Sequence, residues 1–235
     1  MARTLRGVWL GQRPYSEVVL EQERLLAERQ AGRAEDTVLL LEHPAVITLG
    51  RGAKPEHLLA APEVLAEQGI LLEKTSRGGD VTLHAPGQLV AYPIVDLNPD
   101  RRDVRRWVQG LTETMRRLVA ELGVAAGTHP KHVGLWADAA EPQRFEDATT
   151  AALPVKLGAI GVRISRWVTM HGFALNLTND LGLYGLIVPC GIREHGVASV
   201  ESLGGRAVTP EALAPRALEV LGEVTEASVS ELERG

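Results

Sequence analysis

The chain has 235 residues, 45% of them hydrophobic and 23% charged, which is typical of a soluble globular protein and excludes wholesale disorder. Lys and Arg together number 25 and Asp and Glu together number 30, so the formal net charge is −5. This balance excludes a global basic field for binding nucleic acid. At this length we expect one domain over 1–235 with a sizeable core.

Apolar periodicity predicts helices and strands along the whole chain. Helices are expected where apolar residues recur at helical spacing and Gly or Pro marks an end, over 16–31, 62–68, 103–122 and 210–222. Strands are expected in the shorter apolar runs, over 37–42, 46–49, 70–74, 81–83, 89–95, 132–137, 155–164 and 167–177. Strands and helices do not alternate regularly. This favours an α+β fold, a mixed β-sheet with flanking helices, over a doubly wound fold.

Two segments are expected to lie outside these elements. Residues 138–152 are rich in Asp, Glu, Ala and Thr, which predicts a solvent-exposed excursion between two strands. Residues 223–235 form an acidic end of the chain, for which we expect a frayed tail.

Neither a membrane span nor a secretion signal is expected. The longest stretch without a formal charge, 81–95, contains Pro86 and Pro93, and it is shorter than the roughly 18 apolar residues that a spanning helix needs. The first residues carry Arg3 and Arg6 and have no apolar signal-peptide core. We therefore expect a cytoplasmic protein without membrane contact.

Cys190 is the only cysteine, so no internal disulfide and no Cys-rich zinc site can form. An apolar, strand-like run ends at Pro189, and Gly191 permits a sharp turn, which predicts a side chain presented at the end of an element. Cys190 is then either a small buried hydrophobe or a nucleophile. A nucleophile needs a neighbouring cation, because an ordinary cysteine pKa of about 8.5 leaves most of the thiol protonated at pH 7.

Lys156, His84 and His171 are the candidates for that cation. Lys156 is one of only four lysines and lies among apolar and small residues, where it is either a strand-end lysine reaching for water or a functional amine. The consecutive glycines of 77–80 either let backbone N–H groups approach a ligand or simply make a tight turn.

Two further groups of residues have plain interpretations. His129 and His132 are three residues apart, and without further ligands we predict no metal site there. The outer face of the helix over 103–122 carries arginines that are either merely solvated or able to dock an acidic partner, namely Arg105, Arg106, Arg116 and Arg117.

Several spaced motifs, in order along 38–203, resemble the lipoyl(octanoyl) transferase family, whose relatives are the lipoate and biotin protein ligases. The matching segments are 77–84 (RGGDVTLH), 86–89 (PGQL), 155–163 (VKLGAIGVR), 167–176 (WVTMHGFALN) and 187–192 (IVPCGI), with 41–44 and 48–50 also family-like. The resemblance implies the mixed-sheet α+β architecture of those ligases.

The resemblance also implies roles for individual residues. Cys190 would take an octanoyl group as a thioester, and Lys156 would favour its thiolate form and shuttle protons. The residues expected to line the acyl site are Arg77, Gly78, Gly79, Asp80, Val81, Thr82, Leu83, His84, Ala159, Ile160, Gly161, Gly172, Phe173 and Ala174. No metal, nucleotide or organic cofactor would be needed.

The donor implied by the family is octanoyl-acyl carrier protein. The acceptor is a lysine ε-amine on a lipoyl domain of a 2-oxoacid dehydrogenase or on the glycine cleavage H protein. Thioester exchange keeps the acyl group activated, so no ATP is required. Burying the octanoyl tail is worth up to about 5–6 kcal/mol, which requires an apolar slot.

Two features depart from the family pattern. Ala85 stands where the family usually has Gly, and its Cβ is tolerable only where the backbone avoids positive φ. The excursion over 138–152 is also longer than expected between those strands.

Three alternatives remain open from the sequence. An ATP-dependent lipoate or biotin protein ligase needs a mononucleotide site and no catalytic cysteine, so a requirement for ATP and Mg²⁺ would identify it. A non-catalytic module that binds acyl groups or a carrier protein would keep its affinity when Cys190 is lost. An amidotransferase that moves octanoyl between lipoyl domains would differ only in its preferred donor.

Overall fold

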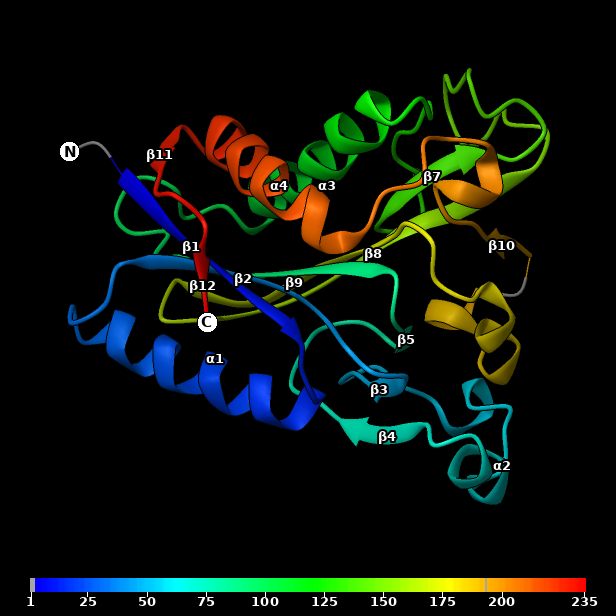
Figure 1. Ribbon diagram of the computed structural model, residues 1–235, viewed down its shortest axis with the longest axis horizontal. Helices are drawn as coiled ribbons and strands as arrows, with labels where there is room; N and C mark the ends of the chain where they lie inside the picture. Colours follow the sequence, from blue (N-terminus) through cyan, green and yellow to red (C-terminus); the bar gives the residue numbers. More distant parts are fainter. Residues whose placement is uncertain (1–2, 193) are drawn as a thin grey trace.

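The computed structural model describes residues 3–192 and 194–235, whose strands form two sheets (Figure 1). The strands of the larger sheet are β1 Arg3–Gln12, β2 Asp36–Glu42, β6 Gln88–Ile94, β7 Leu135–Asp138, β8 Pro154–Ser165, β9 Val168–Asn176, β10 Gly196–Val197, β11 Ala227–Val229 and β12 Glu233–Arg234. Their order is β10-β8-β9-β6-β2-β1-β11, with β7 also beside β8 and β12 also beside β1. The sheet is mixed: β1 and β2 are parallel, whereas β6, β8 and β9 are joined by antiparallel pairing.

Helices cover both faces of this sheet. They are α1 Tyr15–Gln30, α3 Val104–Glu121 and α4 Pro210–Thr225, whereas the short helix α2 Pro62–Glu67 packs near the strand Leu71–Lys74 of the smaller sheet. Figure 1 shows α3 and α4 on one face of the larger sheet and α1 on the other. The alternation of β2 matches this layering, because Val38 and Leu40 belong to one apolar cluster and Leu39 and Leu41 to a second.

The α3 helix is placed by its apolar stripe. Trp107, Leu111 and Met115 are buried against the sheet, and the Asp103 side chain caps the helix by accepting a hydrogen bond of 2.9 Å from the Arg106 N–H. A Cβ on Gly158 of β8 would lie 2.6 Å from Met115 Sδ, so the glycine leaves the space that the Met115 side chain of α3 fills.

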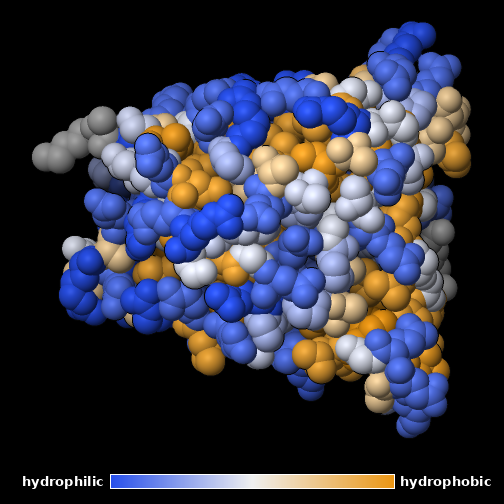
Figure 2. Space-filling model, in the orientation of Figure 1, coloured by the Kyte–Doolittle hydropathy of each residue, from blue (hydrophilic) through white to orange (hydrophobic). Residues whose placement is uncertain are grey.

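The smaller sheet has the order β4-β3-β5, formed by β3 Val46–Leu49, β4 Leu71–Lys74 and β5 Val81–His84. Leu59, Val64, Leu71 and Leu72, from this sheet and the α2 region, are exposed. Figure 2 shows apolar atoms at the lower right, where Figure 1 places β4 and α2. No helix within 3–192 or 194–235 is both long and apolar enough to cross a membrane.

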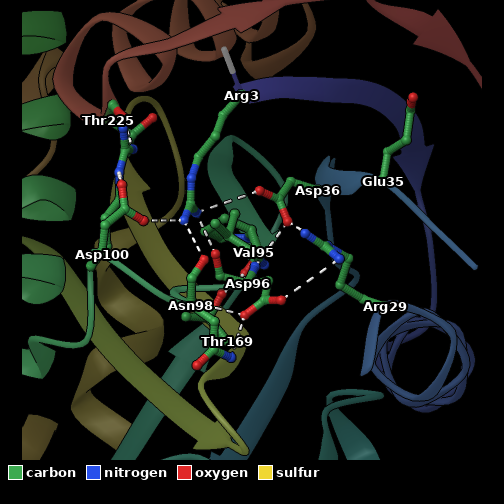
Figure 3. A network of polar contacts seen from close by, with 12 residues as sticks. Arg3, Arg29, Glu35, Asp36, Val95, Asp96, Asn98, Asp100, Thr169 and Thr225 are labelled. Atoms are coloured by element: carbon green, nitrogen blue, oxygen red, sulfur yellow. Dashed lines mark hydrogen bonds and ion pairs between the residues drawn. The ribbon is translucent and has the colours of Figure 1, made fainter. Parts of the chain in front are cut away.

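A polar network fastens four chain segments where β1 and β2 begin (Figure 3). The buried Asp36 carboxylate accepts hydrogen bonds from Arg29 Nε at 2.7 Å and from the Asp96 N–H at 2.9 Å. Arg3 approaches the same carboxylate and also donates to the Asn98 carbonyl at 2.5 Å. The network therefore ties β1 and β2 to the end of α1 and to the chain that follows β6.

The prediction of a frayed tail over 223–235 is wrong. The first three of these residues belong to α4, β11 pairs with Arg3–Leu5, and β12 pairs with Val8–Trp9. The physical reason is that β1 pairs with β2 on one side only. Its other edge has unpaired backbone N–H and C=O groups, and the end of the chain pairs with them. An ion pair of 2.6 Å between Arg6 and Glu233 adds to this contact.

Other elements also differ from expectation. Strand β1 was not predicted from the sequence, because Arg and Gly interrupt its apolar residues. The predicted strand at 132–137 begins only at Leu135, after a turn in which Gly134 has a φ of +135°. The apolar run before Pro189 is not a regular strand: a 3₁₀ helix, Leu181–Leu186, precedes it, and Ile187 forms only an isolated bridge. The remaining predicted helices and strands are confirmed, with ends shifted by up to three residues.

The excursion over 138–152 begins at Asp138, the last residue of β7, and has no helix or strand beyond it, as expected. Asp138 closes its base, because its carboxylate accepts hydrogen bonds from the N–H groups of Ala140, Ala152 and Leu153. Most of the segment is exposed, but Phe145 and Ala148 pack in the cluster around Trp136.

Candidate functional site

A cavity of about 360 Å³ lies between β8 and β9 of the larger sheet and the loop that precedes β5. This volume is within the range of small-molecule sites. Cys190 and Lys156 both line it. Of the residues expected to line an acyl site, those on its wall are Arg77, Gly79, Asp80, Thr82, His84, Ala159, Ile160, Gly161, Gly172, Phe173 and Ala174.

The strand period explains why Val81 and Leu83 do not line this cavity. Successive side chains of β5 point to opposite faces, so Thr82 and His84 face the cavity, whereas Val81 and Leu83 are buried in the apolar cluster of the smaller sheet. Gly78 is also absent from the wall; its N–H donates to the Val162 carbonyl at 3.0 Å and joins the loop to β8. The expectation that these three residues line the site is therefore corrected.

Lys156 and Cys190 meet at the cavity wall. Lys156 Nζ lies 3.1 Å from Cys190 Sγ, although 34 residues separate the two along the chain. The Lys156 side chain is only 6% exposed, and its Nζ lies 5.8 Å from the ring centroid of Trp136. A Cβ on Gly134 would come within 2.7 Å of Lys156 Cε, so this glycine leaves the room that the lysine occupies.

Cys190 has a left-handed backbone conformation, with a φ of +55°, within the short turn Pro189–Gly191. A non-glycine residue in this region is strained, and such strain is concentrated at functional sites. Gly191 follows with a φ of +71°, and a Cβ there would lie 2.7 Å from His57 Cε1. The turn predicted at Pro189–Gly191 is thus confirmed, and it places the half-buried Cys190 on the cavity wall, beside the apolar cluster around Trp136.

The two histidines that were candidates for a cation beside Cys190 are neutral at pH 7. Burial lowers the pKa of His84 to about 3, and its Nδ1 lies 2.8 Å from Gln88 Oε1. Burial, with help from the Arg77 charge, lowers the pKa of His171 to about 3. Of the three candidates, Lys156 is the one whose side-chain nitrogen contacts the sulfur.

The glycine loop at 77–80 is held tightly against its neighbours. The buried Arg77 guanidinium donates to the Thr48 carbonyl at 2.7 Å and to the Thr48 hydroxyl at 2.9 Å. A Cβ on Gly161 would lie 3.0 Å from Arg77 Cδ, so the loop packs directly on β8. Asp80 Oδ2 lies 2.5 Å from His57 Nδ1. Arg77 and Asp80 thus fix the rim of the cavity beside Cys190.

A buried hydrogen-bond network lies beneath β5. Gln88 Nε2 donates to Asn176 Oδ1 at 2.9 Å, and the Tyr184 hydroxyl lies 3.2 Å from the same oxygen. In the turn before β6, Gly87 has a positive φ of +84°. Ala85, which is buried, does not have a positive φ. The condition for tolerating an alanine at position 85 is therefore met.

Several residues at the site were not found from the sequence. Tyr15, Tyr92, Lys131, His132 and Ile192 also line the cavity. Ile192 ends the matched motif 187–192 but was not named as a lining residue, whereas Tyr15, Tyr92 and the adjacent pair Lys131 and His132 lie outside the matched motifs. Sequence position alone could not identify Tyr15 as a lining residue, because α1 reaches the cavity only by packing on β6 and β9.

The arginine face of α3 is largely compensated by acidic residues of the chain itself. Arg116 Nε lies 2.6 Å and Arg117 Nε 2.7 Å from the carboxylate of Glu113. These two arginines therefore offer less free positive charge than the sequence alone suggests.

The fold and the cavity define an enzyme-like site on a scaffold shared with the lipoate protein ligases. A solved bi-partite lipoate protein ligase from Thermoplasma acidophilum, described with its E2 lipoyl domain, matches with a TM-score of 0.70 and 13% identity, over 100% of this chain and 88% of that one. Lipoate-protein ligase A bound with ATP matches with a TM-score of 0.69 and 12% identity, over 100% and 90%. At such identities the likeness establishes the fold, which confirms the expected ligase-like architecture.

The chain belongs to the family described as the lipoyl protein ligase A/B catalytic domain, whose model matches residues 14–222. An octanoyltransferase of Chloroflexus aurantiacus is 43% identical over 222 residues, 94% of each chain. An octanoyltransferase of Myxococcus xanthus is 46% identical over 199 residues. This match covers 85% of this chain but only about half (53%) of that longer protein. These relatives support an acyltransferase.

Proposed function

We propose that this chain transfers an octanoyl group from octanoyl-acyl carrier protein, through a thioester on Cys190, to a lysine ε-amine of a lipoyl domain. The observation that carries the proposal is the 3.1 Å contact between Lys156 Nζ and Cys190 Sγ on the wall of a cavity of about 360 Å³. An amine at this distance can stabilise a thiolate and exchange a proton with groups that react there.

The reaction divides into two acyl transfers at one sulfur. In the first, Cys190 Sγ attacks the carbonyl carbon of the donor thioester, the donor carbon–sulfur bond breaks, and the departing thiolate takes a proton from Lys156. In the second, the acceptor amine attacks the Cys190 thioester, loses its excess proton to Lys156, and releases the Cys190 thiolate. The first step passes the acyl group from one thioester to another, and the second forms an amide, which is more stable than the thioester. Neither step therefore consumes a nucleotide.

The walls of the cavity suit an aliphatic chain. Ile160, Phe173 and Ala174 line it along the paired strands β8 and β9, and Gly161 and Gly172 lie opposite one another on the same strands. Small residues at this pair leave space where larger side chains would meet the loop or the backbone of β6. The acyl tail can thus be buried while its carbonyl stays beside Cys190.

The second candidate is an ATP-dependent ligase, because the same fold serves lipoate-protein ligase A, which has been solved bound with ATP. The Cys190–Lys156 contact favours the transferase, since a ligase that activates its substrate with ATP needs no thiol at this position. A ligase requires ATP and Mg²⁺ for turnover, whereas the proposed transferase works without either.

The test is a mass spectrum of the intact protein after incubation with octanoyl-acyl carrier protein in the absence of ATP. Because Cys190 is the only thiol, the protein should gain one octanoyl group, and hydroxylamine should remove it. Cys190→Ser should lose both the labile adduct and nearly all turnover. Full turnover by Cys190→Ser, or turnover that depends on ATP, would refute the proposal.

A further inference from the structure

Three histidines gather outside the catalytic contact, although only two of them are close in sequence. His129 and His132 lie in the connection between α3 and β7, and His195 lies between the Cys190 turn and β10. One ring nitrogen from each lies within 4.8 Å of the others. The ring centroids of His129 are 4.6 Å from His132 and 5.4 Å from His195. Three imidazole nitrogens at these distances can reach a single ion.

The cluster rests on a rigid wall and has a carboxylate beside it. Trp136 is fully buried, and its ring lies 4.9 Å from His129 and 5.3 Å from His195 between centroids. Its Nε1–H donates to the His132 carbonyl at 3.2 Å, which fixes the turn that carries this histidine. Glu194 Oε1 lies 3.6 Å from His132 Nε2.

We propose that His129, His132 and His195 bind a divalent transition-metal ion of the zinc type, with Glu194 or water as the fourth ligand. Three imidazoles and one oxygen ligand form a donor set that suits tetrahedral Zn²⁺. Ca²⁺ and Mg²⁺ prefer oxygen ligands and are not favoured here. Nδ1 of His129 accepts an exposed hydrogen bond of 3.0 Å from the Lys131 N–H, which breaks if this nitrogen becomes the ligand.

Such an ion would connect two segments that border the cavity. His132 lines the cavity wall, and His195 follows Cys190 by five residues in the chain, so a bound ion would join the turn before β7 to the segment after the thiol. Trp136 contacts the cluster and also lies 5.8 Å from Lys156 Nζ. Trp136 therefore lies between the cluster and the Lys156 side chain. The metal site itself does not depend on the proposed transfer reaction.

The test is metal binding by the full-length, tag-free protein, measured by calorimetry with Zn²⁺ and by the visible spectrum with Co²⁺. We expect one ion per chain and a tetrahedral Co²⁺ spectrum without a thiolate charge-transfer band. His129→Ala and His195→Ala should each weaken Zn²⁺ binding about tenfold or more. Zn²⁺ should raise the thermal unfolding midpoint of the wild type and not that of these variants.

Two control variants separate the cluster from the other groups near the cavity. Cys190→Ser removes the thiol, and His57→Gln removes the histidine that contacts Asp80; both should bind Zn²⁺ with the wild-type affinity. Unchanged binding in the cluster variants, loss of binding in Cys190→Ser, or a thiolate band with Co²⁺ would overturn the proposal. Unfolding midpoints measured without metal show whether each variant is folded, and His195→Gln replaces His195→Ala if that variant is not.

Discussion

Acid should destabilise this protein well above the pH at which its carboxylates titrate, because three buried histidines are neutral in the folded state. Burial lowers the pKa of His43 to about 4. Burial is also the main cause that lowers the pKa values of His84 and His171 to about 3. His43 has the hydrogen bonds of a neutral ring: Nδ1 donates to the Arg13 carbonyl at 2.7 Å, and Nε2 accepts from the Tyr92 hydroxyl at 2.9 Å.

The sign and size of the effect follow from proton uptake. In the unfolded chain these histidines take up protons as the pH falls through about 6.5, whereas in the folded chain they stay neutral until about pH 4 or below. Protons therefore favour unfolding across this window. Between pH 7.5 and pH 5.5 each histidine lowers the free energy of unfolding by about 1.4 kcal/mol, and the three together by about 4 kcal/mol, a large part of the 5–15 kcal/mol that is usual for a domain.

The assay is urea unfolding at pH 7.5 and at pH 5.5. His43→Leu should reduce the difference in unfolding free energy between the two pH values by about one third, whatever its cost at pH 7.5. Tyr92→Phe is the matched control: it removes the hydroxyl bonded to His43 but no group that titrates in this window, so the difference should persist.

An unfolding free energy that stays constant between these pH values would refute the reasoning. It would mean that His84 and His171 can carry a proton in the folded protein. The argument that excludes both as the cation beside Cys190 would then fail with it.

Three further predictions concern the site. Lys156→Ala should raise the pH midpoint of Cys190 alkylation by iodoacetamide and sharply reduce turnover. Lys156→Arg should restore part of the alkylation and little of the turnover. An alkylation profile of Lys156→Ala identical to that of the wild type would exclude Lys156 as the activating cation. Ile160→Trp should narrow the cavity, so that kcat/KM falls about tenfold or more for octanoyl and less for shorter donors; an equal loss for every chain length would argue against an acyl slot at Ile160. Reversing Arg105 and Arg106 to Glu should raise the KM for carrier-bound donor, more so at low salt, and an unchanged KM would place carrier docking elsewhere.

The elements of this protein could largely be predicted from the sequence, because they depend on local patterns. The α3 helix follows from an apolar stripe closed by Asp103 and Gly123, and β5 and β9 follow from apolar runs bounded by glycine and turn residues. Most of the residues that line the cavity were named through a family resemblance. Strand periodicity then decided that Thr82 faces the cavity and Leu83 does not.

Long-range pairing was beyond local pattern, and only the tertiary structure decided it. Strand β1 and the paired tail depend on an edge that exists only once the sheet is assembled, so neither segment carries a strong strand signal of its own. The contact between Lys156 and Cys190, and the arrival of His195 beside His129, join positions that are far apart in the chain. Sequence spacing fixes which side chains share a face of one element, whereas distances between elements are set by how those faces pack.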